Sequence, residues 1–273
     1  MKIITADKIS KTVADLCAEA NFVLRKDVLS QLKNAYRKES LRRAKDILKA
    51  TIDNSAVAQR ERLAICQDTG LPCVFVELGQ EVVIKGDLKN AINKGIENGY
   101  REGYLRASII KDPLSRGVSG YGPAIIHLDL VKGRKLKLTV LPKGFGCENK
   151  TQLKMFKPTE EIMQVKKFIV EAVKAAGPDA CPPFVVGVGI GGSAEYACLL
   201  AKKALLRNLK AKASNLEKEL LQQINQLKIG PMGLGGKTTA LAVNIETFPT
   251  HIAGLPVAVN ISCHALRSAA KAI

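Results

Sequence analysis

Apolar and polar positions recur at different periods along the chain, which begins as a helical region and continues as a mixture. Residues 6–60 carry apolar residues near the spacing of an amphipathic helix, so we predict helices throughout this region. Residues 72–86 alternate and contain β-branched side chains, which predicts a strand or a hairpin. Residues 87–105 return to helical spacing.

The later pattern mixes strands with helices. Two alternating segments joined around Gly133 predict strands, and a Gly-broken apolar segment predicts another strand before a helix. A charged stretch, 202–228, is helical in period, with a break predicted near Ser214 and Asn215. The predicted strands are 122–131, 135–144, 182–192, 238–248 and 255–262, and the predicted helices are 159–177, 193–206 and 265–273. This order predicts an α/β fold of mixed sheets surrounded by helices, in one domain of residues 1–273.

Composition agrees with a folded domain in a reducing compartment. The chain has 273 residues and is 47% hydrophobic, enough for a sizeable core. Its start lacks the apolar core of a signal peptide, and no apolar run reaches the length of a membrane span. Seven cysteines, an odd number, argue against a disulfide framework. We therefore expect a cytoplasmic protein without membrane contact.

The net charge of +17 allows two interpretations. A strongly basic chain can bind nucleic acid, or it can carry a lysine-rich solvated surface that also attracts a small anionic substrate. The basic residues are scattered, without the interleaved aromatic residues on which bases stack. We therefore expect no nucleic-acid partner.

Two glycine-rich segments resemble nucleotide-binding motifs and fall short of them. Gly187, Gly189 and Gly192 have the GxGxxG spacing, but a basic stretch stands where the dinucleotide fingerprint needs a second strand ending in an acidic residue. The segment GPMGLGGKTT, 230–239, has Pro231 where a P-loop needs its first glycine. Zinc also fails, because the few histidines and the cysteines lack paired ligand spacing.

Three cysteines lie where active sites tend to gather, at loops and strand ends. Cys66 precedes a Gln-Asp-Thr-Gly turn, Cys181 precedes the Gly-rich strand, and Cys263 follows the apolar strand 255–262. Thiolates far apart in sequence can hold an iron–sulfur cluster when the fold brings them together. Burial statistics alone favour core residues instead.

The surrounding segments favour the cluster. ICQDTG, PKGFGCENK, CPPFVVGVGIGGSAE, GLGGKTTALAV and THIAGLPVAVNISCHALR occur in this order. Together they resemble the iron–sulfur-dependent class I fumarases and the related tartrate dehydratases, over roughly residues 10 to 270. The match is to the N-terminal half of these enzymes, which is a separate alpha subunit in two-chain members.

The resemblance implies a ligand set and a substrate site. Cys66, Cys181 and Cys263 match the ligands of a 4Fe–4S cluster with one open iron site, which a substrate hydroxyl or carboxylate can reach. The other matching residues surround the substrate: Gln67 and Asp68 beside the first ligand, Arg106 for a carboxylate, His251 twelve residues before the third ligand, and Gly144 and Gly146 in the loop 144–150. Asp68 and His251 are the expected proton-handling residues.

One residue departs from the family pattern. Cys147 stands where a serine is expected in the loop, as a small serine-like residue or a spare thiol near the cluster. Cys17, Cys73 and Cys198 match no ligand and are interpreted as core residues. His264, beside the third ligand, is a candidate supporting residue, and His127 is interpreted as structural.

The resemblance also implies an activity and a partner. It predicts the alpha subunit of a hydro-lyase, with fumarate hydration to L-malate as the first choice and L(+)-tartrate dehydration as the alternative. A separate beta subunit, in an expected α2β2 assembly, would supply the base for the carbon-bound proton. Two rival functions have single supports: a nucleotide-binding oxidoreductase rests on the GxGxxG spacing, and a nucleic-acid-binding module rests on the charge.

Overall fold

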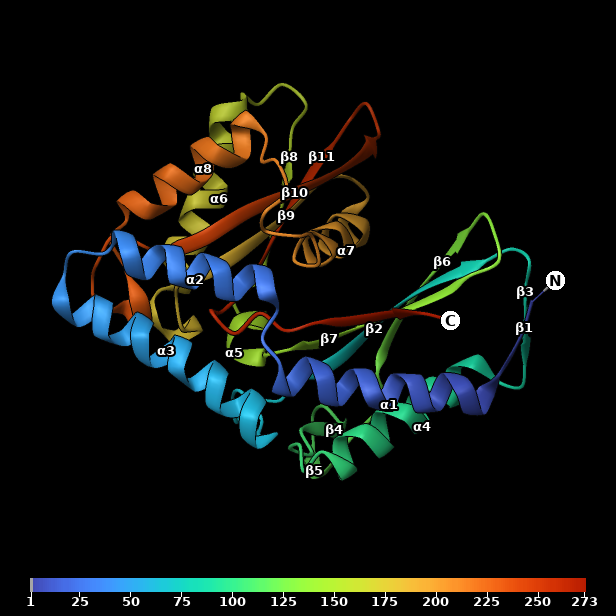
Figure 1. Ribbon diagram of the computed structural model, residues 1–273. Helices are drawn as coiled ribbons and strands as arrows, with labels where there is room; N and C mark the ends of the chain where they lie inside the picture. The colour runs from blue at the N-terminus through green and yellow to red at the C-terminus, as the bar shows by residue number, and fades with distance from the viewer. Residues whose placement is uncertain (1) are drawn as a thin grey trace. The chain divides into compact units, whose positions relative to one another are not determined.

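The computed structural model describes residues 2–273 and confirms the mixed α/β class (Figure 1). The chain forms two compact units and passes between them four times. Unit 1 comprises the residues up to Arg25, Ser55–Phe145 and Arg267–Ile273, and unit 2 comprises Lys26–Asn54 and Gly146–Leu266. The expectation of a single domain stays a prediction.

Unit 1 is a four-stranded sheet with two helices packed on it. The sheet order is β12-β7-β2-β6, with β2 antiparallel to β7 and parallel to β6. The apolar faces of α1 and α4 and of the central strands form one buried core, which includes Ile9, Val13 and Val74. The elements are β2 (Leu71–Gly79), β6 (Ile125–Val131), β7 (Leu136–Lys143), β12 (Ala269–Ala272), α1 (Ala6–Phe22) and α4 (Leu88–Glu102).

The strand pairing in unit 1 differs from what neighbouring segments suggest. β6 and β7 follow each other around Gly133, yet β2 lies between them in the sheet. Residues 72–86 form no hairpin, because β3 (Val82–Lys85) leaves the sheet and pairs in parallel with β1 (Lys2–Thr5). Pairing of this kind depends on residues far away in sequence, which local alternation does not report.

The predicted C-terminal helix is wrong. Residues 269–272 form β12, which pairs antiparallel with β7 along the register Ala269 to Val140. Alanine favours a helix in isolation, but the edge of β7 offers backbone partners and a place in the core for Ala269 and Ile273. Tertiary contacts therefore override the local preference.

Unit 2 has three layers around a sheet of order β10-β9-β11-β8 (Figure 1). One face packs against α6 and α8 through residues such as Val186, Val257 and Ile169, and the opposite face packs against α7. The strands are β8 (Gln152–Phe156), β9 (Phe184–Gly192), β10 (Ala240–Thr250) and β11 (Leu255–Ser262). The helices are α2 (Lys26–Lys38), α3 (Arg42–Glu61, which continues into unit 1), α6 (Ile162–Ala176), α7 (Ala194–Ala204) and α8 (Asn215–Gln226).

The glycines of β9 serve helix packing. A Cβ at Gly189 would lie 2.0 Å from the carbonyl oxygen of Ala197, so α7 approaches the strand closely only because this position lacks a side chain. Gly187 has the same relation to Ala201. The GxGxxG spacing thus has a structural explanation here.

The helix limits follow local chemistry. The predicted break in 202–228 is confirmed, because the Ser214 hydroxyl accepts from the N–H of Glu217 and caps the start of α8. Residues 205–214 are irregular, and α6 begins only at Ile162. The strands β1 and β8, and the hairpin of β4 (Ile109–Asp112) and β5 (Arg116–Gly120), were not predicted. No helix within residues 2–273 is long and apolar enough to span a membrane.

Candidate functional site

The ICQDTG loop, 65–70, connects α3 to β2 in unit 1, and Asp68 ties it to the end of β7. Its Oδ1 accepts from the N–H of Gly70 at 3.0 Å, and its Oδ2 accepts from the N–H of Phe145 at 2.9 Å. Cys66 and Asp68 are half-buried and Gln67 is exposed. The Asp68 carboxylate, which is predicted to handle a proton, therefore also holds the ICQDTG loop to Phe145, just after β7.

Glycines allow these two segments to meet closely. Gly70 has φ of +76°, and a Cβ there would lie 2.6 Å from the carbonyl carbon of Pro142. A Cβ at Gly144 would lie 3.2 Å from the Asp68 Oδ2. Gly146, which belongs to unit 2, has no comparable crowding. A side chain at Gly70 would therefore push the ICQDTG loop away from β7.

Thr69 joins the same loop to Arg106. Its side chain is 2% exposed, and its hydroxyl accepts from the Arg106 N–H at 3.1 Å and lies 3.4 Å from the Arg106 carbonyl oxygen. The buried Tyr100 hydroxyl donates to the Thr69 carbonyl at 2.8 Å. These bonds fix the backbone of Arg106. Arg106 itself is exposed, so its side chain can reach a carboxylate.

Arg267 is a site residue that the sequence patterns did not single out. It is 3% exposed, and its Nη2 donates to the Asp68 carbonyl at 2.6 Å while its Nη1 donates to the Asn21 Oδ1 at 3.3 Å. The only indication in the sequence is its place four residues after Cys263, at the end of the family segment THIAGLPVAVNISCHALR. A buried arginine thus fixes the backbone beside Cys66.

In unit 2 the segments around Cys181 and Cys263 meet. Cys181 is exposed and has φ of +54°, an uncommon left-handed conformation for a residue with a side chain. Its carbonyl oxygen lies 3.4 Å from the backbone N of His264 and 3.1 Å from the ring Nδ1. Because a carbonyl only accepts, this contact requires the proton on Nδ1. The β9–β11 register, Ser262 beside Val185, brings these segments together.

Cys147 supports the Cys181 turn. It is 5% exposed, and its Sγ donates to the carbonyl oxygen of Ala180 at 3.3 Å. A thiol that donates keeps its proton, whereas a metal ligand is a thiolate. This geometry explains a cysteine in place of a serine, since both side chains are small donors.

Exposure separates the predicted ligands from Cys17 and Cys73 but not from Cys198, which is half-buried like Cys66 and Cys263 and is not the fully buried core residue expected. Cys181 is exposed and Cys66 and Cys263 are half-buried, whereas Cys17 and Cys73 are fully buried. Burial raises the pKa of the Cys17 thiol and also that of the half-buried Cys198. Within residues 2–273 no three His, Cys, Asp or Glu side chains are grouped around one metal-ion position. A 4Fe–4S cluster does not require its cysteines to surround one metal position, because each thiolate binds a separate iron atom.

His251 lies away from the predicted ligands of its own unit. It is exposed in the turn between β10 and β11, where its Nδ1 accepts from the N–H of Ala253 at 3.1 Å. Cys263 follows the opposite end of β11, and eight strand residues span roughly 25 Å. Unit 2 alone therefore does not bring His251 to Cys263 or Cys181.

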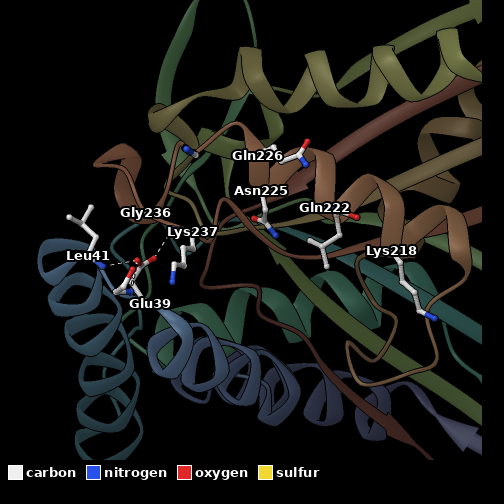
Figure 2. Close-up of a pocket in the computed structure, with 11 residues that line it drawn as sticks. Glu39, Leu41, Lys218, Gln222, Asn225, Gln226, Gly236 and Lys237 are labelled. Atoms are coloured by element: carbon white, nitrogen blue, oxygen red, sulfur yellow. Dashed lines mark hydrogen bonds between the residues drawn. The ribbon is translucent and has the colours of Figure 1, made fainter.

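The glycine-rich segment 230–239 encloses an internal carboxylate. Glu39, Gly236 and Lys237 line a cavity of about 800 Å³ together with residues of α8. Figure 2 shows Glu39 beside Gly236 and Lys237. Glu39 is 4% exposed, and it accepts from the backbone N–H groups of Leu41 at 2.9 Å and Lys237 at 2.7 Å. The segment that resembles a P-loop thus donates a backbone N–H to the Glu39 carboxylate. None of the predicted site residues lines this cavity.

Comparison with known families decides the classification. A family model described as fumarate hydratase (Fumerase) matches residues 10–272. The chain belongs to the fumarate hydratase family. The resemblance inferred from the cysteine-centred segments is thereby confirmed.

Several relatives of this fumarate hydratase family member are named for a related activity, L(+)-tartrate dehydration. A protein of Methanocaldococcus jannaschii named "Putative L(+)-tartrate dehydratase subunit alpha" is 43% identical over 97% of this chain and 98% of its own length. The L(+)-tartrate dehydratase subunit alpha of Escherichia coli strain UTI89 is 32% identical, and that of strain K12 is 31% identical, over 96% of this chain and 89% of their lengths.

Proposed function

We propose that this chain is the alpha subunit of a hydro-lyase that removes water from L(+)-tartrate. The observation that carries the proposal is the 43% identity over nearly the full length of both chains to a relative with that name. The sequence alone favoured fumarate, and the description of the family keeps fumarate hydration to L-malate as the second candidate. Both substrates are four-carbon dicarboxylic acids, so the two candidates need the same kind of site.

We propose that Cys66, Cys181 and Cys263 hold a 4Fe–4S cluster. The support is that none of the three is fully buried, that Cys181 has a left-handed backbone, and that the Cys147 thiol donates to the carbonyl of the preceding Ala180. When bound, the cluster supplies a Lewis acid for the substrate hydroxyl that departs as water.

The protein residues would bind and orient the substrate. The Arg106 guanidinium is suited to a carboxylate, since its donors match both carboxylate oxygens. Thr69 fixes the Arg106 backbone, and Gln67 presents an exposed amide from the neighbouring loop. Orientation of this kind makes a large contribution to catalysis when reacting groups are held in place.

Proton handling by Asp68 and His251 stays a proposal. Both Asp68 oxygens accept backbone N–H groups, which leaves each oxygen one further lone pair for a substrate hydroxyl. His251 lies at the opposite end of β11 from Cys263. It could therefore act only on a substrate that is bound away from that cysteine. His264, whose ring Nδ1 lies 3.1 Å from the Cys181 carbonyl oxygen, is a further candidate beside Cys181.

The proposed function includes a beta subunit. The relatives are named alpha subunits, which implies a further subunit in each of those proteins. For this chain we propose the same arrangement, with an α2β2 assembly as the expectation and the base for the carbon-bound proton on the beta subunit.

The test is anaerobic co-expression of this chain with the beta subunit encoded in the same genome. Turnover of L(+)-tartrate, L-malate and fumarate is then compared for the complex and for the alpha chain alone. We expect the complex to prefer L(+)-tartrate and the alpha chain alone to be inactive. A preference for fumarate would select the second candidate, and turnover of none of the three would overturn the function.

A further inference from the structure

The β4–β5 hairpin, residues 109–120 of unit 1, exposes large apolar side chains. Its strands pair only with each other within residues 2–273. Leu114 is 91% exposed and Val118 is 90% exposed, and Tyr104, just before the hairpin, is 97% exposed. These are the three most exposed large apolar side chains of the described residues. Large apolar side chains left this exposed close together in the sequence are candidates for an interaction site.

The hairpin has a defined shape despite its exposure. The Asp112 carboxylate accepts from the N–H groups of Leu114 at 2.8 Å and Ser115 at 3.0 Å, which fixes the turn. The Ser115 hydroxyl and these N–H groups hold the pKa of Asp112 below its usual range. A two-stranded hairpin is at best marginally stable in water by itself. A shaped hairpin with exposed apolar residues is therefore suited to binding a partner.

The hairpin is continuous with the substrate-binding part of unit 1. It begins three residues after Arg106, whose backbone Thr69 holds. Ser108 lies between them and donates from its hydroxyl to the Arg106 carbonyl at 3.4 Å. A partner on the hairpin would therefore lie next to the arginine predicted to bind a carboxylate.

Charge distinguishes a different subunit from a second copy. Residues 104–120 contain Arg106, Lys111 and Arg116 against a single carboxylate, Asp112, in a chain of net charge +17. A second copy would bring like charge to this surface, which opposes association. An acidic surface with apolar pockets complements it.

We propose that the 109–120 hairpin is the docking surface for the beta subunit, which places Leu114 and Val118 in apolar contacts and Lys111 and Arg116 against carboxylates. This inference rests on the proposed function, because it takes its partner from there. It makes Arg106 a residue at the edge of the subunit interface.

The test compares a hairpin variant with a control in unit 2, and the single substitution Leu114→Asp is measured as well because it matches the control in charge. Leu114→Asp with Val118→Asp alters the hairpin, and Ile252→Asp alters an equally apolar side chain that is 89% exposed in unit 2. The dissociation constant of each alpha chain for the beta subunit of the same genome is measured by titration, with circular dichroism to verify folding. We expect the hairpin variant to bind at least about tenfold more weakly and Ile252→Asp to bind as the parent does.

A third variant tests the charge. Arg116→Glu should weaken binding, and the difference from the parent should shrink as salt is raised, because screening removes the charge contribution. Unchanged binding by the leucine–valine variant would overturn the docking surface and leave the function standing. Self-association of the parent chain that the same variant abolishes, or no binding of the beta subunit by the parent, would overturn the choice of partner. A complex that forms through the hairpin but turns over no dicarboxylate would overturn the function alone.

Discussion

The buried hydroxyl of Thr69 is hydrogen-bonded to the backbone of Arg106, 37 residues further along the chain. The Arg106 N–H donates to Thr69 Oγ1 at 3.1 Å, and the same hydroxyl lies 3.4 Å from the Arg106 carbonyl oxygen. The contact joins the turn after Cys66 to the start of the segment that leads into the 109–120 hairpin. Thr69 therefore positions Arg106 and does not itself face the solvent.

Thr69→Val should weaken substrate binding. Valine keeps the shape of threonine but leaves the Arg106 N–H without its acceptor, at a cost of about 1–3 kcal/mol. We expect KM for the dicarboxylate to rise roughly tenfold, with a smaller change in kcat, in steady-state assays of the complex with the beta subunit. Thr69→Ser, which keeps the hydroxyl, should behave like the parent. Equal kinetics for the valine and serine variants would contradict the positioning role.

The cysteine assignment predicts which variants lose iron. Cys66→Ser, Cys181→Ser and Cys263→Ser should each lose most of the iron and sulfide after anaerobic reconstitution, because each removes a thiolate ligand. The parent should contain about four of each atom, as a 4Fe–4S cluster requires. Iron and sulfide analysis and the visible absorption measure the result.

Cys73→Ser and Cys147→Ser are the matched controls, because both thiols are buried. Both variants should retain the cluster, and Cys147→Ser should be the milder change because a serine hydroxyl also donates to the Ala180 carbonyl. Loss of iron from either control equal to that from Cys181→Ser would show that the ligand set is wrong.

Arg267→Met should destabilise unit 1. The substitution removes the donors to the Asp68 carbonyl and to the Asn21 Oδ1 in a buried position. We expect the free energy of unfolding to fall by about 2–4 kcal/mol, measured by urea denaturation of the alpha chain. Arg101→Met is the control, since Arg101 makes an exposed ion pair with Glu97 that contributes about 0–0.5 kcal/mol. Equal effects of the two substitutions would show that burial of Arg267 is unimportant.

The elements whose patterns are local were predictable, and those that depend on distant partners were not. The strand 255–262 and the break at Ser214 follow directly from alternation and capping. β12 and the insertion of β2 between β6 and β7 depend on pairing across more than 40 residues. An alanine-rich end carries no signal for such pairing, because its helical preference is weak and easily overridden.

The site shows the same division. Asp68, Arg106 and Gly144 were named from separate segments, and hydrogen bonds or close approach now connect those segments within unit 1. Thr69 and Arg267 hold these contacts; Thr69 lay in the ICQDTG motif with its role left open, and Arg267 was not singled out. A buried arginine cannot be told from the other basic residues of this chain by sequence pattern, since only its surroundings make it unusual.

Glu39 predicts a pH dependence of stability. Burial disfavours its charged form, but the three backbone N–H groups that it accepts and the nearby charge of Lys237 outweigh burial and lower the pKa below 4.5. A lowered pKa in the folded state means that ionised Glu39 stabilises the fold. This contribution is fully present above pH 4.5, the ordinary value for the unfolded chain, and is lost as pH falls through the lower folded value.

Glu39→Gln should therefore cost stability mainly at neutral pH. Glutamine removes the charge and places an amide N–H where one backbone donor now binds, so we expect a loss of about 1–3 kcal/mol at pH 7. The difference from the parent should shrink as the pH falls below 4.5, in urea denaturation followed by circular dichroism at several pH values. Glu61→Gln, at an exposed ion pair with Arg60, should show almost no difference at any pH. A Glu39→Gln difference that stays constant or grows on acidification would mean that the ionised carboxylate does not stabilise the turn around Lys237.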